Sequence, residues 1–303
     1  MKLPPVGGPG GASGWMVAGA LSFATMGALV HAIGSRCDWL VVALVRALMM
    51  LATAAALTRA SGARLVIWRP GTLWVRSLAG SFSLVCNFYA LNRLPVADAV
   101  TLSNVFPLWI VLISSVALRR APTLGESIGL ACGMAGVILI ERPHLGGDRL
   151  AASVALLSSV STAVAMLGLH RLRDLDPRAV VAHFAGVASL ISAAWLLLRA
   201  GSMAPPSIDR TTLALLLGVG ITGTIGQVLL TKAYAAGAPT KVAVVGLTQV
   251  VFAMGFDVVL WHRPITPAAL AGFVLVLAPT TWISIRSARK LSPGPEAVGK
   301  VPR

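Results

Sequence analysis

The chain has 303 residues, of which 56% are hydrophobic and only 12% are charged. A soluble domain needs roughly 25% charged residues to cover its surface, so this composition excludes an ordinary water-soluble protein. The net charge of +15 does not indicate nucleic-acid binding, because the Lys and Arg residues stand in short clusters between long apolar runs and form no basic stripe. We therefore assign this charge to the edges of a membrane.

Ten segments in the chain are long and apolar enough to cross a bilayer, for which a helix needs about 20 residues. Residues 1–13 precede them as a Gly- and Pro-rich segment, which we expect to be a flexible tail and not a signal peptide. Pro, Gly and charged residues separate the segments. The pattern predicts an all-α integral membrane protein with ten transmembrane helices. The predicted spans are 14–34, 39–58, 71–91, 97–118, 123–141, 150–169, 179–199, 211–231, 241–261 and 266–285.

The distribution of basic residues predicts the orientation of these spans, because cytoplasmic loops carry an excess of Lys and Arg. If the N-terminus is cytoplasmic, 17 of the 25 Lys and Arg residues fall on that side and 7 on the other, with Arg46 inside the second span. We expect a multi-pass protein of the plasma (inner) membrane with both termini in the cytoplasm.

The two halves of the chain resemble each other. A shift of 144 residues places the third and fourth spans on the eighth and ninth, and it places Pro95 on Pro239. Five spans in each half is an odd number, so the halves cross the membrane in opposite directions, and substrate sites in such proteins lie between the repeats. We predict a first repeat over 14–145, a second over 146–286 and a basic cytoplasmic tail over 287–303. On one helical face, the shift carries Arg76, Gly80, Ser83 and Asn87 onto Gly220, Thr224, Gln227 and Thr231.

The segment 89–118, YALNRLPVADAVTLSNVFPLWIVLISSVAL, resembles the signature region of the drug/metabolite transporter superfamily, EamA type. The resemblance extends over essentially the whole chain and implies ten spans in two repeats. It also implies transport of small organic molecules, without indicating which. Matching residues are Tyr89, Ala90, Leu91, Leu94, Pro95, Ala97, Ala99 and Pro107, and Arg46 and Arg76 match arginines of the second and third helices of the family.

The sequence departs from this family at one position in each half. Members commonly carry a Glu near the end of the fourth helix, where this chain has Arg120, and Arg263 holds the matching place in the second half. Glu126 lies further along the chain. A different gating or packing arrangement at the membrane edge is therefore expected.

Polar side chains inside the predicted spans are the candidate substrate contacts. An ionisable group at the centre of a bilayer costs about 2.5 to 3.5 kcal/mol, so it needs a partner, a water-filled cavity or a function. Arg46 lies near the middle of the second span, where it suits either an anionic substrate group or a structural bond to backbone carbonyls. Arg76 lies near the predicted cytoplasmic edge and is also able to reach water. The predicted substrate pathway comprises Arg46, Arg76, Asn87, Tyr89, Asn104, Gln227, Thr231 and Gln249.

Three further residues are candidates for ion coupling. Asp257 lies several residues inside the ninth span, His31 near the outer end of the first, and Lys232 close to the cytoplasmic edge. Each also has an ordinary alternative, namely facing water, lying at the interface or extending to the headgroups. Pro107 is the candidate for helix flexing, with a static kink as the alternative.

These features favour a secondary transporter, an exporter or exchanger of small organic metabolites such as amino acids, acting by alternating access between two inverted repeats. The alternative is a channel or a structural membrane subunit without active transport. The sequence has no HExxH, GxSxG, Walker A or dinucleotide motif, so we predict no enzyme activity, no cofactor and no metal. The predicted partners are a small-molecule substrate and the lipid bilayer, with no nucleic acid and with a homodimer possible.

Overall fold

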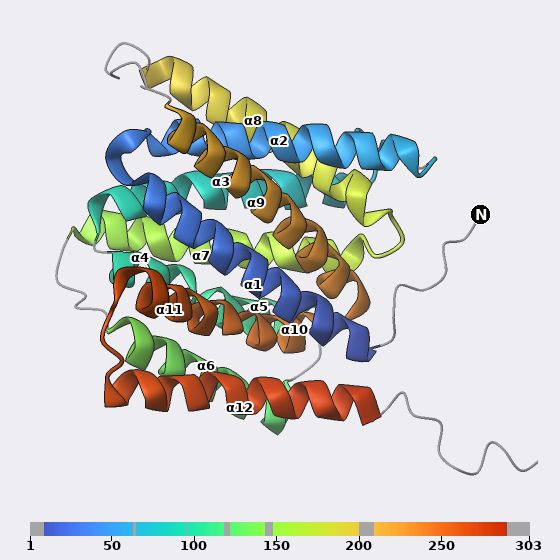
Figure 1. The fold of residues 1–303 in the computed structure, drawn as a ribbon. Helices are drawn as coiled ribbons and strands as arrows, with labels where there is room; N and C mark the ends of the chain where they lie inside the picture. The colour runs from blue at the N-terminus through green and yellow to red at the C-terminus, as the bar shows by residue number, and fades with distance from the viewer. Residues whose placement is uncertain are drawn as a thin grey trace, which may run out of the picture.

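The computed structural model describes residues 9–62, 65–94, 96–117, 122–142, 148–199 and 209–289, and within these ranges the regular structure is entirely helical. The helices run side by side as one bundle, with α1 beginning and α12 ending at the same end (Figure 1). We call this the terminal end and the other the opposite end. In the first half the helices are α1 (Pro9–Ile33), α2 (Trp39–Ala60), α3 (Gly71–Arg93), α4 (Val96–Ser103), α5 (Phe106–Ala117) and α6 (Leu124–Glu141). In the second half they are α7 (Arg149–Arg171), α8 (Pro177–Arg199), α9 (Arg210–Ala236), α10 (Pro239–Gly246), α11 (Thr248–Trp261) and α12 (Pro267–Arg289).

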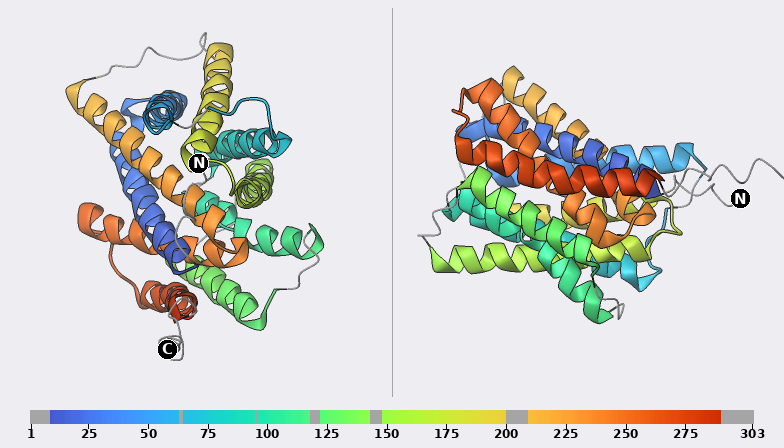
Figure 2. Two further views of the ribbon diagram at one scale, coloured as in Figure 1. Left: turned by 90° about the vertical axis from the view of Figure 1, so that its right-hand side faces the viewer. Right: turned by 90° about the horizontal axis from the view of Figure 1, so that it is seen from below.

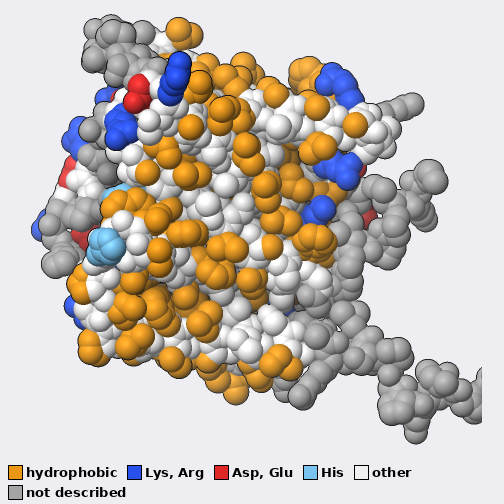
Figure 3. Space-filling model, viewed as in Figure 1, with side chains coloured by type: hydrophobic (Ala, Val, Ile, Leu, Met, Phe, Trp, Pro, Cys, Tyr) orange, Lys and Arg blue, Asp and Glu red, His pale blue; other side chains and the backbone are white. Residues whose placement is uncertain are grey.

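These helices form the ten expected spans, with α4 and α5 sharing one span and α10 and α11 another. Within the described residues, nine spans are long and apolar enough to cross a membrane by themselves. The span outside those nine is α3, which carries Arg76, Asn87 and several serines along its length. Figure 3 shows hydrophobic side chains over the middle of the bundle and Lys and Arg side chains gathered at its two ends. The protein is a multi-pass membrane protein.

Side-chain caps set several helix starts. Asp38 accepts from the backbone N–H of Leu40 at 2.7 Å at the start of α2. Thr123 and Glu126 form a reciprocal capping box at the start of α6. The start of α1 at Pro9 differs from the expected tail over 1–13, because residues 9–13 continue the apolar helix; residues 1–8 lie outside the described part.

The packing of the helices follows a pseudo-two-fold relationship between the two five-helix repeats. α1 packs along α9, and its counterpart α7 packs along α3. In the same way, the contact between α2 and α9 corresponds to the contact between α8 and α3. Two helices also pack directly against their own counterparts, α2 against α8 and α6 against α12. Figure 2 shows these crossings from two further directions. Contacts between the repeats therefore make up much of the interior.

Two spans are broken at equivalent places, whereas the sequence predicted continuous helices over 97–118 and 241–261. In the first half, Asn104 and Val105 form a turn between α4 and α5. In the second half, Leu247 interrupts the span between α10 and α11. Pro107 lies in the first turn of α5, where its missing N–H leaves no helical bond unmade. The break after Gly246 has no proline, so the second interruption was not visible in the sequence.

Candidate functional site

The contacts between the repeats carry the polar residues that the sequence singled out on α3. Arg76 lies between α7 and α8, since it contacts Gly168 and Phe184. Ser83 bonds to Ser158 and Thr162 of α7, at 3.1 and 2.6 Å. The polar face of α3 is thus turned toward the second repeat.

Among the described residues Arg76 is the largest fully buried side chain, with 1% of its surface exposed. Its guanidinium carbon lies 3.9 Å from the centre of the Phe184 ring, a cation–π contact. Nε and Nη1 are buried without a hydrogen-bond partner, and Arg76 has no acidic partner among the described residues. The side chain points into the bundle, whereas the sequence also allowed it to reach the membrane edge. A buried, unpaired guanidinium is suited to holding an anion.

Arg46 occupies a related place on the other side of the bundle. Its Nε would lie 2.9 Å from a Cβ added to Gly223 of α9, and this nitrogen is also buried without a partner. The rest of the side chain is partly exposed, and none of its contacts within the described residues is a hydrogen bond or an ion pair. Arg46 therefore also keeps donors available inside the bundle.

The pseudo-symmetry relates the surroundings of these two arginines. Counted from the helix ends, Gly80 lies as far before the end of α3 as Gly223 lies before the end of α9, one residue away from the 144-residue register that pairs Gly80 with Thr224. Arg46 and Phe184 lie equally far after the starts of α2 and α8. A Cβ on Gly80 would lie 3.0 Å from the Phe184 ring, just as one on Gly223 would meet Arg46. At the contact between α2 and α9, the side chain of Arg46 occupies the space beside Gly223. At the contact between α3 and α8, the Phe184 ring occupies the space beside Gly80, with Arg76 stacked on the ring.

A second group of polar side chains surrounds the helix breaks. Asn87 of α3 accepts a hydrogen bond from Ser103 at the end of α4, at 3.0 Å. Asn104, in the break, donates through Nδ2 to the carbonyl of Val100 at 2.9 Å. Gln249 lies just after the second break and is partly buried. The first break thus brings Asn87 and Asn104 to the same region, through Ser103, and Gln249 lies beside Thr248, the residue that the 144-residue shift pairs with Asn104.

Other predicted pathway residues lie in tighter packing. Gln227 of α9 is buried and its amide nitrogen has no hydrogen-bond partner. Thr231 donates to the carbonyl of Gln227 at 2.7 Å, so its hydroxyl is used within the helix. The ring of Tyr89 lies 5.5 Å from the guanidinium carbon of Arg93, near the opposite end of the bundle. Of these three, only Gln227 has an unused polar atom in the interior.

The candidates for ion coupling lie near the two ends of the bundle, with Asp257 and His31 toward the opposite end and Lys232 toward the terminal end. Asp257 forms an ion pair with Arg263 at 3.0 Å. His31 packs edge-on against Trp261 with ring centres 4.4 Å apart. The Nζ of Lys232 lies 4.7 Å from the Trp15 ring. Arg263 also donates to the carbonyl of Ile140 at 3.4 Å. Arg120, the other position at which the sequence departs from the family pattern, lies outside the described residues.

The two ends of the bundle are packed differently. At the terminal end, one continuous apolar cluster joins helices of both repeats and includes Met16, Ile110, Leu169, Tyr234 and Val244. At the opposite end, the described residues form three separate clusters, one each around α1–α2–α9, α3–α4–α7 and α6–α11–α12. The apolar packing between helices of the two repeats is therefore more continuous at the terminal end.

Comparison with known proteins identifies the family. The EamA-like transporter family matches residues 11–142 and again 149–285, one match for each repeat. The chain belongs to this family. The pseudopaline exporter of Pseudomonas aeruginosa strain PAO1 is 30% identical over 207 residues, which cover 68% of this chain and 72% of the exporter. Mouse solute carrier family 35 member G1 is 24% identical over 232 residues, covering 71% of this chain and 61% of the carrier.

The fold agrees with that of a solved structure. One crystal structure superimposes with a TM-score of 0.78 over 93% of this chain and 99% of the other, at 21% identity. At this identity the match establishes the fold alone. The family match and the transporters among its relatives show that the chain is a membrane transporter of the drug/metabolite transporter superfamily.

Proposed function

We propose that this EamA-like protein is a secondary transporter that exports or exchanges small organic metabolites carrying a carboxylate or another acidic group, such as amino acids and related compounds. The observation that supports this substrate class is the pair of arginines, Arg46 and Arg76, that lie inside the bundle with unpartnered nitrogens. Retaining such groups costs free energy in a membrane interior. A substrate carboxylate would satisfy them with charge-assisted hydrogen bonds.

The direction of transport is proposed from a relative. The pseudopaline exporter of P. aeruginosa is named for export, and it is 30% identical to this chain. The excess of Lys and Arg on one side of the predicted spans supports a location in the plasma membrane with both termini in the cytoplasm. On this orientation the terminal end is the cytoplasmic end.

Alternating access is proposed as the mechanism. The apolar cluster at the terminal end supports a state closed toward the cytoplasm, with access from the opposite end where the packing is divided. Because the repeats are inverted, exchanging their conformations would produce the opposite state. The broken spans α4–α5 and α10–α11 provide short helices that are able to move as separate pieces.

A ligand screen tests the proposed substrate class. We would measure the thermal stability of the purified protein against amino acids, dicarboxylates, amines and sugars, since a ligand at 100 times its dissociation constant adds about 2.7 kcal/mol. Acidic compounds should raise the midpoint in the wild type and not in Arg46→Gln, with Asn87→Ala affecting a narrower set of ligands. Stabilisation by amines or sugars alone would contradict the proposal.

A further inference from the structure

A cavity of about 250 Å³ lies at the terminal end of the bundle, away from Arg46 and from the helix breaks. It is bounded by α3, α5 and α7, and Figure 2 (left) shows α7 between the other two on one flank of the bundle. One wall is a single face of α7, where Val164, Leu167, Gly168 and Arg171 follow each other at helical spacing. Val75 of α3, half of whose surface is exposed, forms part of the rim. The cavity therefore opens sideways, toward the lipid.

The lining is largely apolar with polar groups at defined places. Val75, Ile113, Val164 and Leu167 provide hydrocarbon walls. Ser114, a residue only 7% exposed, is one of the lining residues, and its hydroxyl is buried without a hydrogen-bond partner.

The basic groups of the site lie at the end of α7. Arg171 is its last residue and is exposed, and neither of the ion pairs formed within the described residues involves it. His170 beside it is held in place by a bond between Nδ1 and the carbonyl oxygen of Tyr234 at 3.1 Å. The cavity thus combines an apolar slot at membrane depth with a free guanidinium at the level where headgroups lie.

We propose that this cavity binds an anionic phospholipid, with an acyl chain between α3 and α5 and the headgroup phosphate on Arg171. Basic pockets between transmembrane helices bind anionic headgroups, which matches the charge of this rim. The cavity adjoins the proposed transport core, because Gly168 in its wall packs against Arg76. A Cβ added to Gly168 would lie 2.9 Å from the Cβ of Arg76. A lipid in the cavity is therefore separated from the base of the Arg76 side chain by Gly168 alone. The site is independent of the identity of the transported solute.

The test measures lipid binding to the purified full-length protein by native mass spectrometry and thermal stability. The probes are phosphatidylglycerol, phosphatidylcholine with the same acyl chains, and inorganic phosphate alone. Phosphatidylglycerol should be retained and should raise the midpoint more than phosphatidylcholine, and inorganic phosphate should have no effect. Equal effects of the two lipids would overturn the proposal, as would an equal effect of inorganic phosphate, which would indicate a site for a soluble anion.

Three variants locate the site. Arg171→Gln should weaken phosphatidylglycerol binding about fivefold, the contribution of one basic residue near an anionic headgroup. Arg173→Gln is the matched control, since Arg173 is exposed in the same turn and does not line the cavity, and it should bind as the wild type does. Val75→Trp fills the rim from an exposed position and should reduce retention of both lipids. Equal losses in Arg171→Gln and Arg173→Gln, or full retention in Val75→Trp, would show general surface attraction and overturn the site.

Discussion

The guanidinium of Arg76 stacks on the ring of Phe184, 3.9 Å from its centre, at a contact between the two repeats. A cation–π contact contributes about 2 kcal/mol when it is removed from water, which does not offset the burial of an unpaired charge. The stack therefore explains how the side chain is positioned, and the proposed anionic substrate explains why a charge is kept there.

Replacing Arg76 by methionine tests this explanation. Arg76→Met keeps a long side chain and removes the unpaired charge, so the thermal midpoint should stay level or rise, because apolar replacement of buried charges is often neutral or stabilising. Transport in proteoliposomes should fall at least about tenfold, as expected for the loss of a charge-assisted contact. Arg59→Met, at an exposed position at the end of α2, is the control and should change neither. A lower midpoint with unchanged transport would mean that Arg76 is purely structural.

The space beside Arg46 gives a second prediction. A Cβ on Gly223 would lie 2.9 Å from Nε of Arg46, so Gly223→Ala should displace the guanidinium. Because the arginine is flexible, the stability cost should stay at the low end of overpacking, about 1 kcal/mol, while the KM for an acidic substrate rises. Gly255→Ala is the matched control, since no atom lies within 4 Å of its added Cβ. An unchanged KM in Gly223→Ala would argue against Arg46 as a substrate contact.

The contact between α6 and α12 should be sensitive to size. A Cβ on Gly136 would lie 2.7 Å from the carbonyl oxygen of Gly272, and backbone yields less readily than a side chain. Gly136→Val should therefore lower the free energy of unfolding by about 1 to 3 kcal/mol or more. Thermal unfolding in detergent measures this. Gly27→Val, where the added Cβ meets nothing within 4 Å, should unfold near the wild-type temperature, and a similar loss in both would mean that helix propensity alone is responsible.

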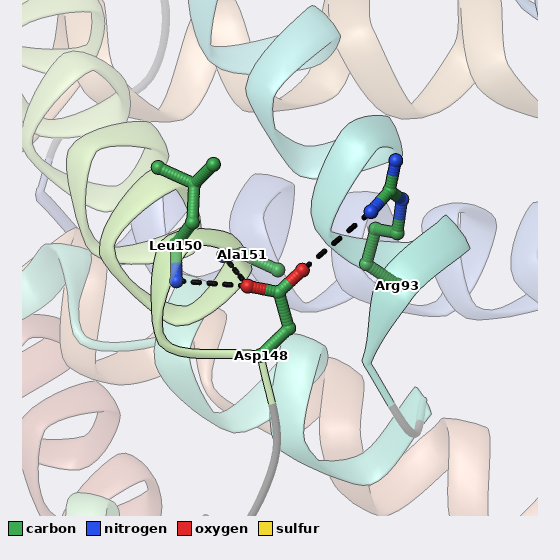
Figure 4. Close-up of polar contacts among 4 residues, drawn as sticks. All are labelled: Arg93, Asp148, Leu150 and Ala151. Atoms are coloured by element: carbon green, nitrogen blue, oxygen red, sulfur yellow. Dashed lines mark hydrogen bonds and ion pairs between the residues drawn. The ribbon is translucent and has the colours of Figure 1, made fainter.

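The carboxylate of Asp148 both forms an ion pair and caps the start of α7, and two substitutions distinguish these contributions. Asp148 forms an ion pair with Arg93 at 3.7 Å and also accepts from the backbone N–H groups of Leu150 and Ala151 at 2.9 and 3.2 Å (Figure 4). The ion pair is partly exposed, with 55% of the Arg93 side chain and 33% of the Asp148 side chain accessible, so Arg93→Ala should cost under ~1 kcal/mol. Asp148→Ala also removes the cap of α7 and should cost about 1 kcal/mol more. Equal thermal midpoints for the two variants would contradict the capping assignment.

The membrane architecture was predictable from the sequence because lipid requires long apolar helices, and the Pro95–Pro239 alignment showed that the chain is internally repeated. The break at Asn104 and Val105 was harder to predict from the sequence, because Pro107 indicated only a kink. The break at Leu247 has no local breaker except the preceding Gly246. Continuous apolar sequence does not report such interruptions, because tertiary packing determines whether the helix continues.

The environment of the candidate residues was harder to predict than their identity. Sequence position placed Arg76 near a membrane edge, but its direction depends on Phe184, more than 100 residues away, which has no polar atom to mark it. The partner of Asp257 proved to be Arg263, one of the two positions that depart from the family pattern. Contacts between repeats depend on side-chain direction, which periodicity within one helix does not fix.

We propose that this protein is a carrier that alternates between two states around an acidic substrate. Counterflow tests it most directly. Proteoliposomes loaded with an unlabelled acidic ligand from the thermal screen are diluted into a trace of the same labelled compound, without an ion gradient. We predict a transient, saturable overshoot of internal label in the wild type that is lost in Arg46→Gln. Equilibration without an overshoot, at a rate that never saturates, would show a channel and contradict the account.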